Sequence, residues 1–106
     1  MATNLPRLTH LQFLVVSELQ RGIARGRDLR DQLRSAGVRQ SGPAFYQMMA
    51  VLEDAGFVIG RYEQQVIDGQ IIRERYYTVS ASGRKAADGS RAFYARATAR
   101  HRPGLA

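Results

Sequence analysis

The feature of this sequence that most constrains its fold is a change in hydrophobic period at Gly56. Before this glycine, apolar residues recur at steps of three and four along a segment that starts with Ser41-Gly42-Pro43, which is typical of an amphipathic helix. From Phe57 onward the period is two, and Asp68-Gly69 is a strong signal for a two-residue hairpin turn. The sequence therefore predicts a helix that leads directly into a two-stranded ribbon.

Two further helices are expected before that unit. Thr9 can cap the first, whose buried stripe places it at the centre of the core and is formed by Leu11, Leu14, Val15 and Leu19. The second covers residues 27–36, turns two leucines inward and ends at Gly37 in a left-handed cap. A short extended piece around Ile23 lies between the two helices.

The predicted turn also sets the register of the ribbon. If Asp68-Gly69 is the whole loop, paired residues have numbers that sum to 137, so Val58 faces Val79 at the buried root. The same register puts Glu63 opposite Glu74, which is unfavourable. Either neighbouring arginines offset this repulsion or the loop is longer than two residues.

A fourth helix is expected over residues 82–101, capped by Ser80 or Ser82. We expect Asp88-Gly89-Ser90 to interrupt it, because glycine inside a helix costs up to ~1 kcal/mol relative to alanine. Pro103-Gly104 should end the ordered part of the chain. Helix, turn, helix and ribbon within 106 residues define the expected fold class, which is mostly α with a small antiparallel β-hairpin (α+β), in winged helix-turn-helix form.

The chain is strongly basic, with a formal net charge of +7. Residues 81–106 contribute most of it, with five arginines and one lysine against one aspartate, whereas residues 57–80 are neutral overall. Arginine forks two hydrogen bonds onto a phosphate or a guanine edge, which lysine cannot do. The charge favours a nucleic-acid partner, although a solvated basic surface or arginine-rich codon usage gives the same composition.

Several other classes of protein are disfavoured. There is no cysteine, which removes disulfides and thiolate metal sites, and no apolar run approaches the ~18 residues that span a membrane. The first residues lack the pattern of a secretion signal, so we expect a cytoplasmic protein. His10 and His101 have no partners at metal-ligand spacing, and no catalytic triad or glycine-rich phosphate loop is visible. We expect neither a cofactor nor enzymatic activity.

Three segments together resemble PadR-like winged-helix transcriptional regulators. They are QFLVVSEL at residues 12–19, SGPAFYQMMAVLEDAGFV at 41–58, and RERYYTVS at 73–80 followed by Gly83-Arg84. The second segment carries the pattern of the family's recognition helix, with a small-residue start, an aromatic, a Leu-Glu pair and a glycine before the first wing strand. Only about 25 residues follow the wing, which is similar to the short branch of the family with one C-terminal helix.

The resemblance implies a division of the chain into two parts. It implies a winged helix-turn-helix DNA-binding domain over residues 1–80 and a C-terminal dimerisation helix with a frayed tail over 81–106. The homodimer would bind double-stranded DNA at a palindromic operator. Repression is the expected outcome, although the sequence does not distinguish a repressor from an activator. Helix 43–55 would lie in the major groove and wing 61–75 at the minor groove. A small-molecule effector is possible, but the resemblance names none.

Candidate DNA contacts lie on this helix and wing. Tyr46 matches an aromatic that the family places at the DNA backbone, although it can also be a partly buried core tyrosine, and Gln47 can pair with adenine. N–H groups at the helix start favour a phosphate, although simple capping explains Ser41 equally well. Strand alternation puts Arg73 and Arg75 on one face of the wing and Arg61 on the other. The predicted contact set is Arg39, Gln40, Ser41, Ala44, Tyr46, Gln47, Arg61, Arg73 and Arg75.

Two further expectations concern the parts of the chain around this surface. The family often has His-Gly-Tyr where this chain has Arg25-Gly26-Arg27, so we expect the start of the second helix to contact phosphate. The candidate dimer seam is Ala86, Phe93, Tyr94 and Ala97. The alternative functions are a winged-helix protein-protein interaction module that uses the same helix face, and a small-molecule sensor with an apolar dimer cleft.

Overall fold

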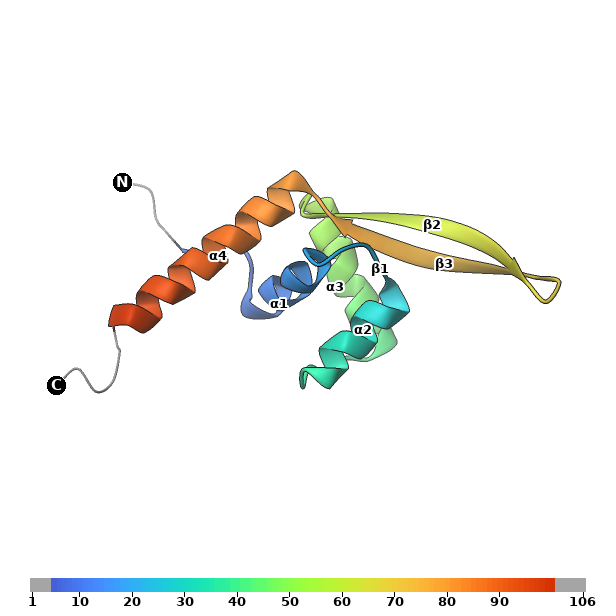
Figure 1. The fold of residues 1–106 in the computed structure, drawn as a ribbon, viewed down its shortest axis with the longest axis horizontal. Helices are drawn as coiled ribbons and strands as arrows, with labels where there is room; N and C mark the ends of the chain where they lie inside the picture. The colour runs from blue at the N-terminus through green and yellow to red at the C-terminus, as the bar shows by residue number, and fades with distance from the viewer. Residues whose placement is uncertain (1–4, 101–106) are drawn as a thin grey trace.

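The computed structural model describes residues 5–100 and confirms the predicted α+β winged-helix fold. Helices α1–α3 form a body, the long β2–β3 ribbon projects from one side of it, and α4 extends towards the other (Figure 1). The molecule is accordingly elongated, with extents of 66 × 30 × 22 Å. The elements are α1 His10–Leu19, β1 Ala24–Arg25, α2 Gly26–Ser35, α3 Gly42–Asp54, β2 Val58–Ile67, β3 Gln70–Val79 and α4 Ala81–Arg100.

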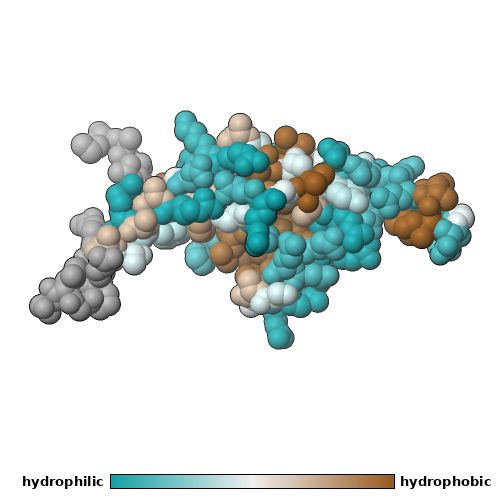
Figure 2. Space-filling model, viewed as in Figure 1, coloured by the Kyte–Doolittle hydropathy of each residue, from teal (hydrophilic) through white to brown (hydrophobic). Residues whose placement is uncertain are grey.

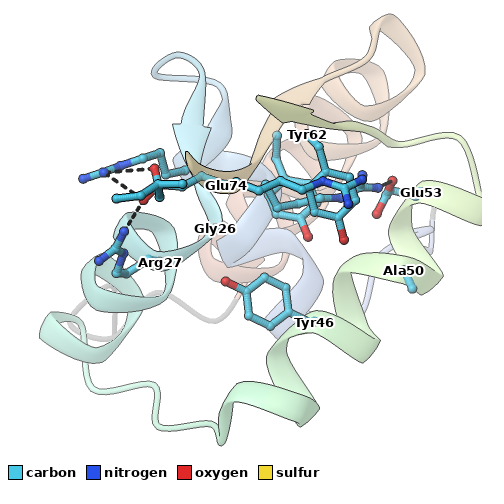
Figure 3. A pocket seen from close by; sticks show the side chains of 12 residues that line it. Gly26, Arg27, Tyr46, Ala50, Glu53, Tyr62 and Glu74 are labelled. Carbon is cyan, nitrogen blue, oxygen red and sulfur yellow. Dashed lines mark hydrogen bonds and ion pairs between the residues drawn. The ribbon is translucent and has the colours of Figure 1, made fainter. Parts of the chain in front are cut away.

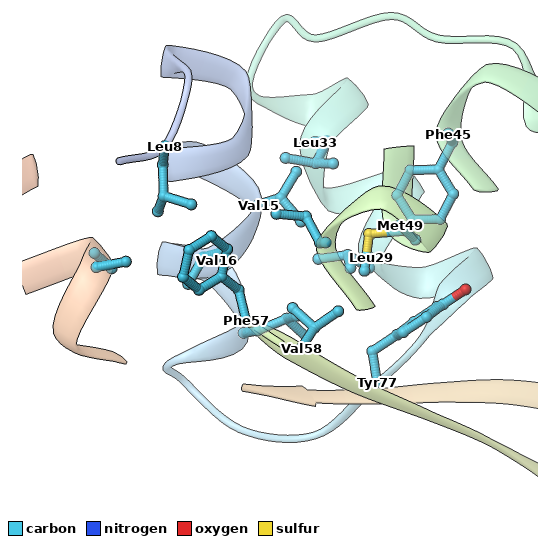
Figure 4. Packing of buried hydrophobic residues seen from close by; sticks show 14 residues of the cluster. Leu8, Val15, Val16, Leu29, Leu33, Phe45, Met49, Phe57, Val58 and Tyr77 are labelled. Atoms are coloured by element: carbon cyan, nitrogen blue, oxygen red, sulfur yellow. The ribbon is translucent and has the colours of Figure 1, made fainter. Parts of the chain in front are cut away.

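The hydrophobic core lies where the three helices of the body meet the root of the ribbon and the first turns of α4 (Figure 4). Helix α1 is central to it, as predicted, and begins with a capping box in which the Thr9 hydroxyl accepts from the Gln12 backbone N–H at 3.1 Å. The buried side chains are Leu8, Val15, Val16, Leu19, Leu29, Leu33, Phe45, Met49, Leu52, Phe57, Val58, Tyr77, Ala86 and Ala87.

The ribbon has the predicted register and the predicted two-residue loop. Val58 pairs with Val79, and the pairing continues to the last pair before Asp68-Gly69. Both loop residues have positive φ, 51° and 78°, as a type I′ turn requires. The ribbon is not purely two-stranded, however. The extended piece expected near Ile23 forms β1, which pairs with β3 and makes a three-stranded sheet of order β1-β3-β2.

The structure shows how the facing carboxylates Glu63 and Glu74 are accommodated. Glu63 pairs with Arg61 of the same strand at 2.9 Å. Glu74 is held by Arg25, at 3.0 Å, and by Arg27. The two arginines that neutralise Glu74 come from β1 and α2, so the body of the protein, rather than the ribbon alone, offsets the repulsion.

Helix α4 is continuous from Ala81 to Arg100, so the predicted interruption at Gly89 is wrong. Ser80 is the cap, and its hydroxyl accepts from the Gly83 N–H at 2.9 Å. The cost of Gly89 is offset because the neighbouring turns of α4 pack on α1, where Arg91 donates to Ser17 at 3.0 Å. The expected helix end at His101 and the Pro103-Gly104 stop lie outside the described residues.

Within residues 5–100 no helix has both the length and the apolar character needed to cross a membrane. In the same range, no group of three or more His, Asp or Glu side chains is placed to hold a metal ion.

Candidate nucleic-acid interface

Helix α3 presents a small and polar flank to solvent. Its start is fixed by Ser41, whose hydroxyl accepts from the Ala44 N–H at 3.2 Å, and by a proline in the first turn, where a missing N–H costs nothing. Because Phe45, Met49 and Leu52 face the core, the other side of the helix is left exposed, as predicted. The exposed residues of that side are Ala44, Gln47, Ala50 and Asp54.

Tyr46 lies at the edge of this flank, 41% exposed, with its ring edge-on to Phe45 at 5.0 Å between centroids. Its hydroxyl points towards the first turn of α2 (Figure 3). A Cβ added at Gly26 would lie 2.9 Å from the Tyr46 ring and hydroxyl oxygen, so a larger residue there would displace the Tyr46 side chain. This role of Gly26 was not predicted from the sequence, in which the one available signal is a glycine at the start of a helix.

The Arg75 guanidinium is engaged inside the chain. It donates to Glu53 of α3 at 2.5 Å, lies 4.5 Å from the centre of the Tyr62 ring, and is only 24% exposed. Burial acts to lower the pKa of Arg75, but hydrogen bonding to Tyr77 and the charge of Glu53 outweigh it and raise the pKa. We therefore reassign Arg75 from a predicted phosphate contact to a residue that positions the wing.

The other two wing arginines remain open to solvent on opposite faces. Arg73 stacks on the Tyr62 ring at 4.1 Å, on the face that looks towards α3, and is exposed. Arg61 is 57% exposed, stands opposite Tyr76 and pairs with Glu63. The predicted alternation of the wing arginines is therefore confirmed, and Arg73 is the one that shares a surface with α3.

Between the ribbon and α3 the surface is hollowed by a cavity of about 600 Å³ (Figure 3). Four arginines and two glutamates border it, so its rim carries a net positive charge. It is lined by Arg25, Gly26, Arg27, Tyr46, Ala50, Glu53, Tyr62, Ile72, Arg73, Glu74, Arg75 and Tyr77. Aromatic hydroxyls and guanidinium groups on a concave basic surface are suited to an extended polyanion.

The arginines at the start of α2 are partly committed to protein contacts, contrary to expectation. Arg25 donates to Asp28 at 2.8 Å and to Glu74, and these two carboxylates raise its pKa. The same hydrogen bond from Arg25 holds the pKa of Asp28 below its usual value. Arg27 also pairs with Glu74, but its side chain is 65% exposed. Of this pair, Arg27 is the more exposed to an incoming anion, since the Arg25 side chain is 38% exposed.

The residues just before α3 differ in their roles. Arg39 is exposed. Gln40 is half-buried, and its backbone carbonyl accepts two hydrogen bonds from Arg30, at 3.2 and 3.1 Å, which fix the turn between α2 and α3. Gln40, which was predicted as a DNA contact, therefore has a structural role through its backbone carbonyl.

On α4, one predicted seam residue is unavailable to a second copy. Ala86 is 5% exposed and lies in the core of its own chain, because the first turns of α4 cover α1. Phe93, Tyr94 and Ala97 are half-buried. Tyr94 packs on Phe13 at 5.7 Å between ring centroids and on Phe93 at 5.5 Å, which makes an aromatic cluster at the junction of α1 and α4.

The architecture is that of a winged helix-turn-helix protein with an added C-terminal helix. Comparison with solved structures shows which winged-helix proteins the chain resembles. No protein-family model and no curated protein matches the sequence. The alignment with a transcriptional regulator from Clostridium thermocellum covers 92% of this chain and 91% of that protein, with a TM-score of 0.72 and 16% identity. The alignment with a PadR family transcription regulator from Clostridium difficile covers 88% of this chain and 98% of that protein, with a TM-score of 0.71 and 17% identity.

A third similar structure is that of Bacillus subtilis PadR in complex with operator DNA. The alignment covers 76% of this chain and 45% of the Bacillus subtilis protein, with a TM-score of 0.64 and 20% identity. The chain therefore has the fold of PadR-family winged-helix regulators.

Proposed function

We propose that this protein is a sequence-specific DNA-binding transcriptional regulator of the PadR type that works as a repressor in the cytoplasm. The observation that carries the proposal is that the exposed α3 flank, through Ala50, and Arg73 of the wing border the same basic hollow. The similar fold of an operator-bound PadR protein supports it. The alternative, a protein-interaction module, would use the same α3 flank, and the exposed arginines Arg27 and Arg73 beside it favour a polyanion over a protein partner.

In this proposal α3 lies in the major groove. Gln47, exposed at the middle of the flank, pairs its amide with an adenine edge, and Ala44 allows close approach to the bases. Arg39 and the N–H groups beside Ser41 hold a phosphate at the start of the helix. The Tyr46 hydroxyl donates a hydrogen bond to a phosphate of the DNA strand that passes between α2 and α3.

The wing then follows the same duplex to the adjacent minor groove. Arg73, stacked on Tyr62, contacts a phosphate there, and Arg61 on the other face contacts flanking backbone. Two copies joined through Phe93, Tyr94 and Ala97 of α4 present two α3 helices to one face of the DNA. A palindromic operator with half-sites about 34–36 Å apart, one helical turn, matches such a dimer.

Selection of bound duplexes from random DNA by the full chain tests this proposal. We expect an inverted repeat to be enriched. Gln47→Ala should then weaken binding to the selected duplex about 10-fold and relax one base position. Gln32→Ala on α2, which removes the same amide from an exposed site lining a different hollow, should leave binding unchanged. Failure to enrich any sequence, with retention of protein partners instead, would favour the interaction module.

A further inference from the structure

The outer part of the wing, residues 64–72, differs from the rest of this basic protein. It contains no arginine or lysine, and its one charged residue is Asp68 in the turn. Besides three glutamines, it has large apolar side chains that are open to solvent: Val66 is 73%, Ile71 71% and Ile67 46% exposed. They form the hydrophobic patch at the free end of the ribbon in Figure 2. Apolar side chains gain little from contact with phosphates, so the apolar part of the wing tip is suited to a different part of a partner than the basic wing root is.

Register places the apolar pair on one particular face. Val66 stands opposite Ile71, two residues along each strand from the Gln64–Arg73 pair and four from the Tyr62–Arg75 pair. Since alternate pairs share a face of a ribbon, the apolar pair lies on the face of Arg73 and Tyr62. That face borders the hollow beside α3. The same face is thus aromatic and basic near the recognition helix and apolar at its end.

We propose that Val66 and Ile71 pack into the minor groove of the duplex that α3 reads, and that they disfavour G·C pairs there. This inference rests on the proposed function. Strands and apolar side chains are known to enter minor grooves, and the guanine N2 amino group is the one donor that distinguishes G·C there. An apolar side chain cannot accept from that amino group, so burying the amino group against Val66 and Ile71 leaves it without a hydrogen-bond partner.

The single negative charge of the wing tip opposes this docking, and its removal gives a further test. Asp68 lies in the turn and not on the apolar pair, at the end of the ribbon. Its charge still repels the phosphates that flank the groove. Asp68→Asn removes the charge and keeps the turn, because Asn-Gly suits a type I′ turn as well. We expect this substitution to tighten DNA binding by about 2- to 5-fold at low salt.

The decisive experiment uses the full chain and the duplex that it selects. The base pairs flanking each half-site are made A·T, G·C or inosine·C, since inosine is guanine without the N2 amino group. We expect A·T and inosine·C duplexes to bind alike, and the G·C duplex about 10-fold more weakly. Val66→Gln with Ile71→Gln should remove this difference. Ile59→Gln, at a 57% exposed position on the opposite face of the ribbon, should keep it.

The outcomes separate the inference from the function on which it rests. Equal binding of the three duplexes, with an intact requirement for Gln47, overturns the wing-tip inference and leaves the regulator proposal standing. Loss of all duplex binding overturns both. If the double variant instead changes self-association in sedimentation and keeps the base preference, the tip binds a second copy and the inference is wrong. Matching circular dichroism spectra establish that the variants are folded.

Discussion

Arg75 of β3 donates to Glu53 of α3 at 2.5 Å, and this contact joins the wing to the proposed recognition helix. The guanidinium lies 4.5 Å from the centre of the Tyr62 ring and 5.8 Å from that of Tyr77. Its hydrogen-bond partner and both rings thus come from α3, β2 and β3. The cluster therefore ties the position of the ribbon to that of α3.

Glu53→Gln should lower the free energy of unfolding by about 1–2 kcal/mol. The two side chains are 24% and 23% exposed, so an uncompensated guanidinium would stay half-buried. Urea denaturation measures the change. Glu63→Gln, which removes an exposed partner of Arg61 on the same ribbon, is the control and should stay within about 0.5 kcal/mol of the parent. Equal losses in the two variants would contradict the positioning role of Glu53.

Arg73→Ala should reduce the dependence of DNA affinity on salt. If its exposed guanidinium neutralises one phosphate, the slope of log affinity against log salt becomes shallower by about 1. Fluorescence anisotropy with the selected duplex at several salt concentrations gives this slope. Arg21→Ala, at a 79% exposed arginine that lines a separate hollow, should leave the slope unchanged. A slope unaltered by Arg73→Ala would remove the wing from the interface.

Gly89→Ala should stabilise the protein by about 0.5–1 kcal/mol. Gly89 is exposed inside the continuous α4, and a Cβ there meets nothing within 4 Å, so alanine adds helix propensity without a clash. A rise in the thermal midpoint of unfolding checks this. A fall would mean that α4 is bent or broken at this glycine in solution.

Gly83→Ala, six residues earlier in the same helix, should have the opposite effect. A Cβ at Gly83 would collide with the backbone carbonyl of Phe57, which cannot move without shifting the start of β2. We expect a loss of at least about 2 kcal/mol, comparable to overpacking of a core. The thermal midpoint of this variant, measured beside that of Gly89→Ala, separates steric contact from helix propensity.

Tyr77→Phe should make stability less sensitive to alkaline pH. Burial raises the pKa of the Tyr77 hydroxyl above its usual value near 10. The unfolded chain then loses this proton at a lower pH than the folded protein does. The contribution of the Tyr77 hydroxyl to the free energy of unfolding is therefore complete below about pH 10 and is lost as the pH rises towards the folded-state pKa. Urea denaturation on both sides of this pH shows the decline. Tyr62→Phe, at a 55% exposed position, should retain the decline that Tyr77→Phe flattens.

The sequence alone determined the features that depend on neighbouring residues. Asp68-Gly69 adopts positive φ at both positions, and this local preference fixed the register of all the pairs between Val58 and Val79. The three- and four-residue spacing of Phe45, Met49 and Leu52 likewise fixed which flank of α3 is exposed. Such preferences act over a few residues, so they can be read in order along the chain.

Tertiary structure alone decided which charged groups remain free to bind a partner. Arg73 and Arg75 look equivalent in the sequence, yet only Arg75 has a carboxylate from α3 within reach. Ala86 lies on a helical face suited to a dimer, yet α1 of its own chain covers it. Contacts of this kind join residues far apart in the sequence, and their energies depend on distance and burial after packing, which no local pattern encodes.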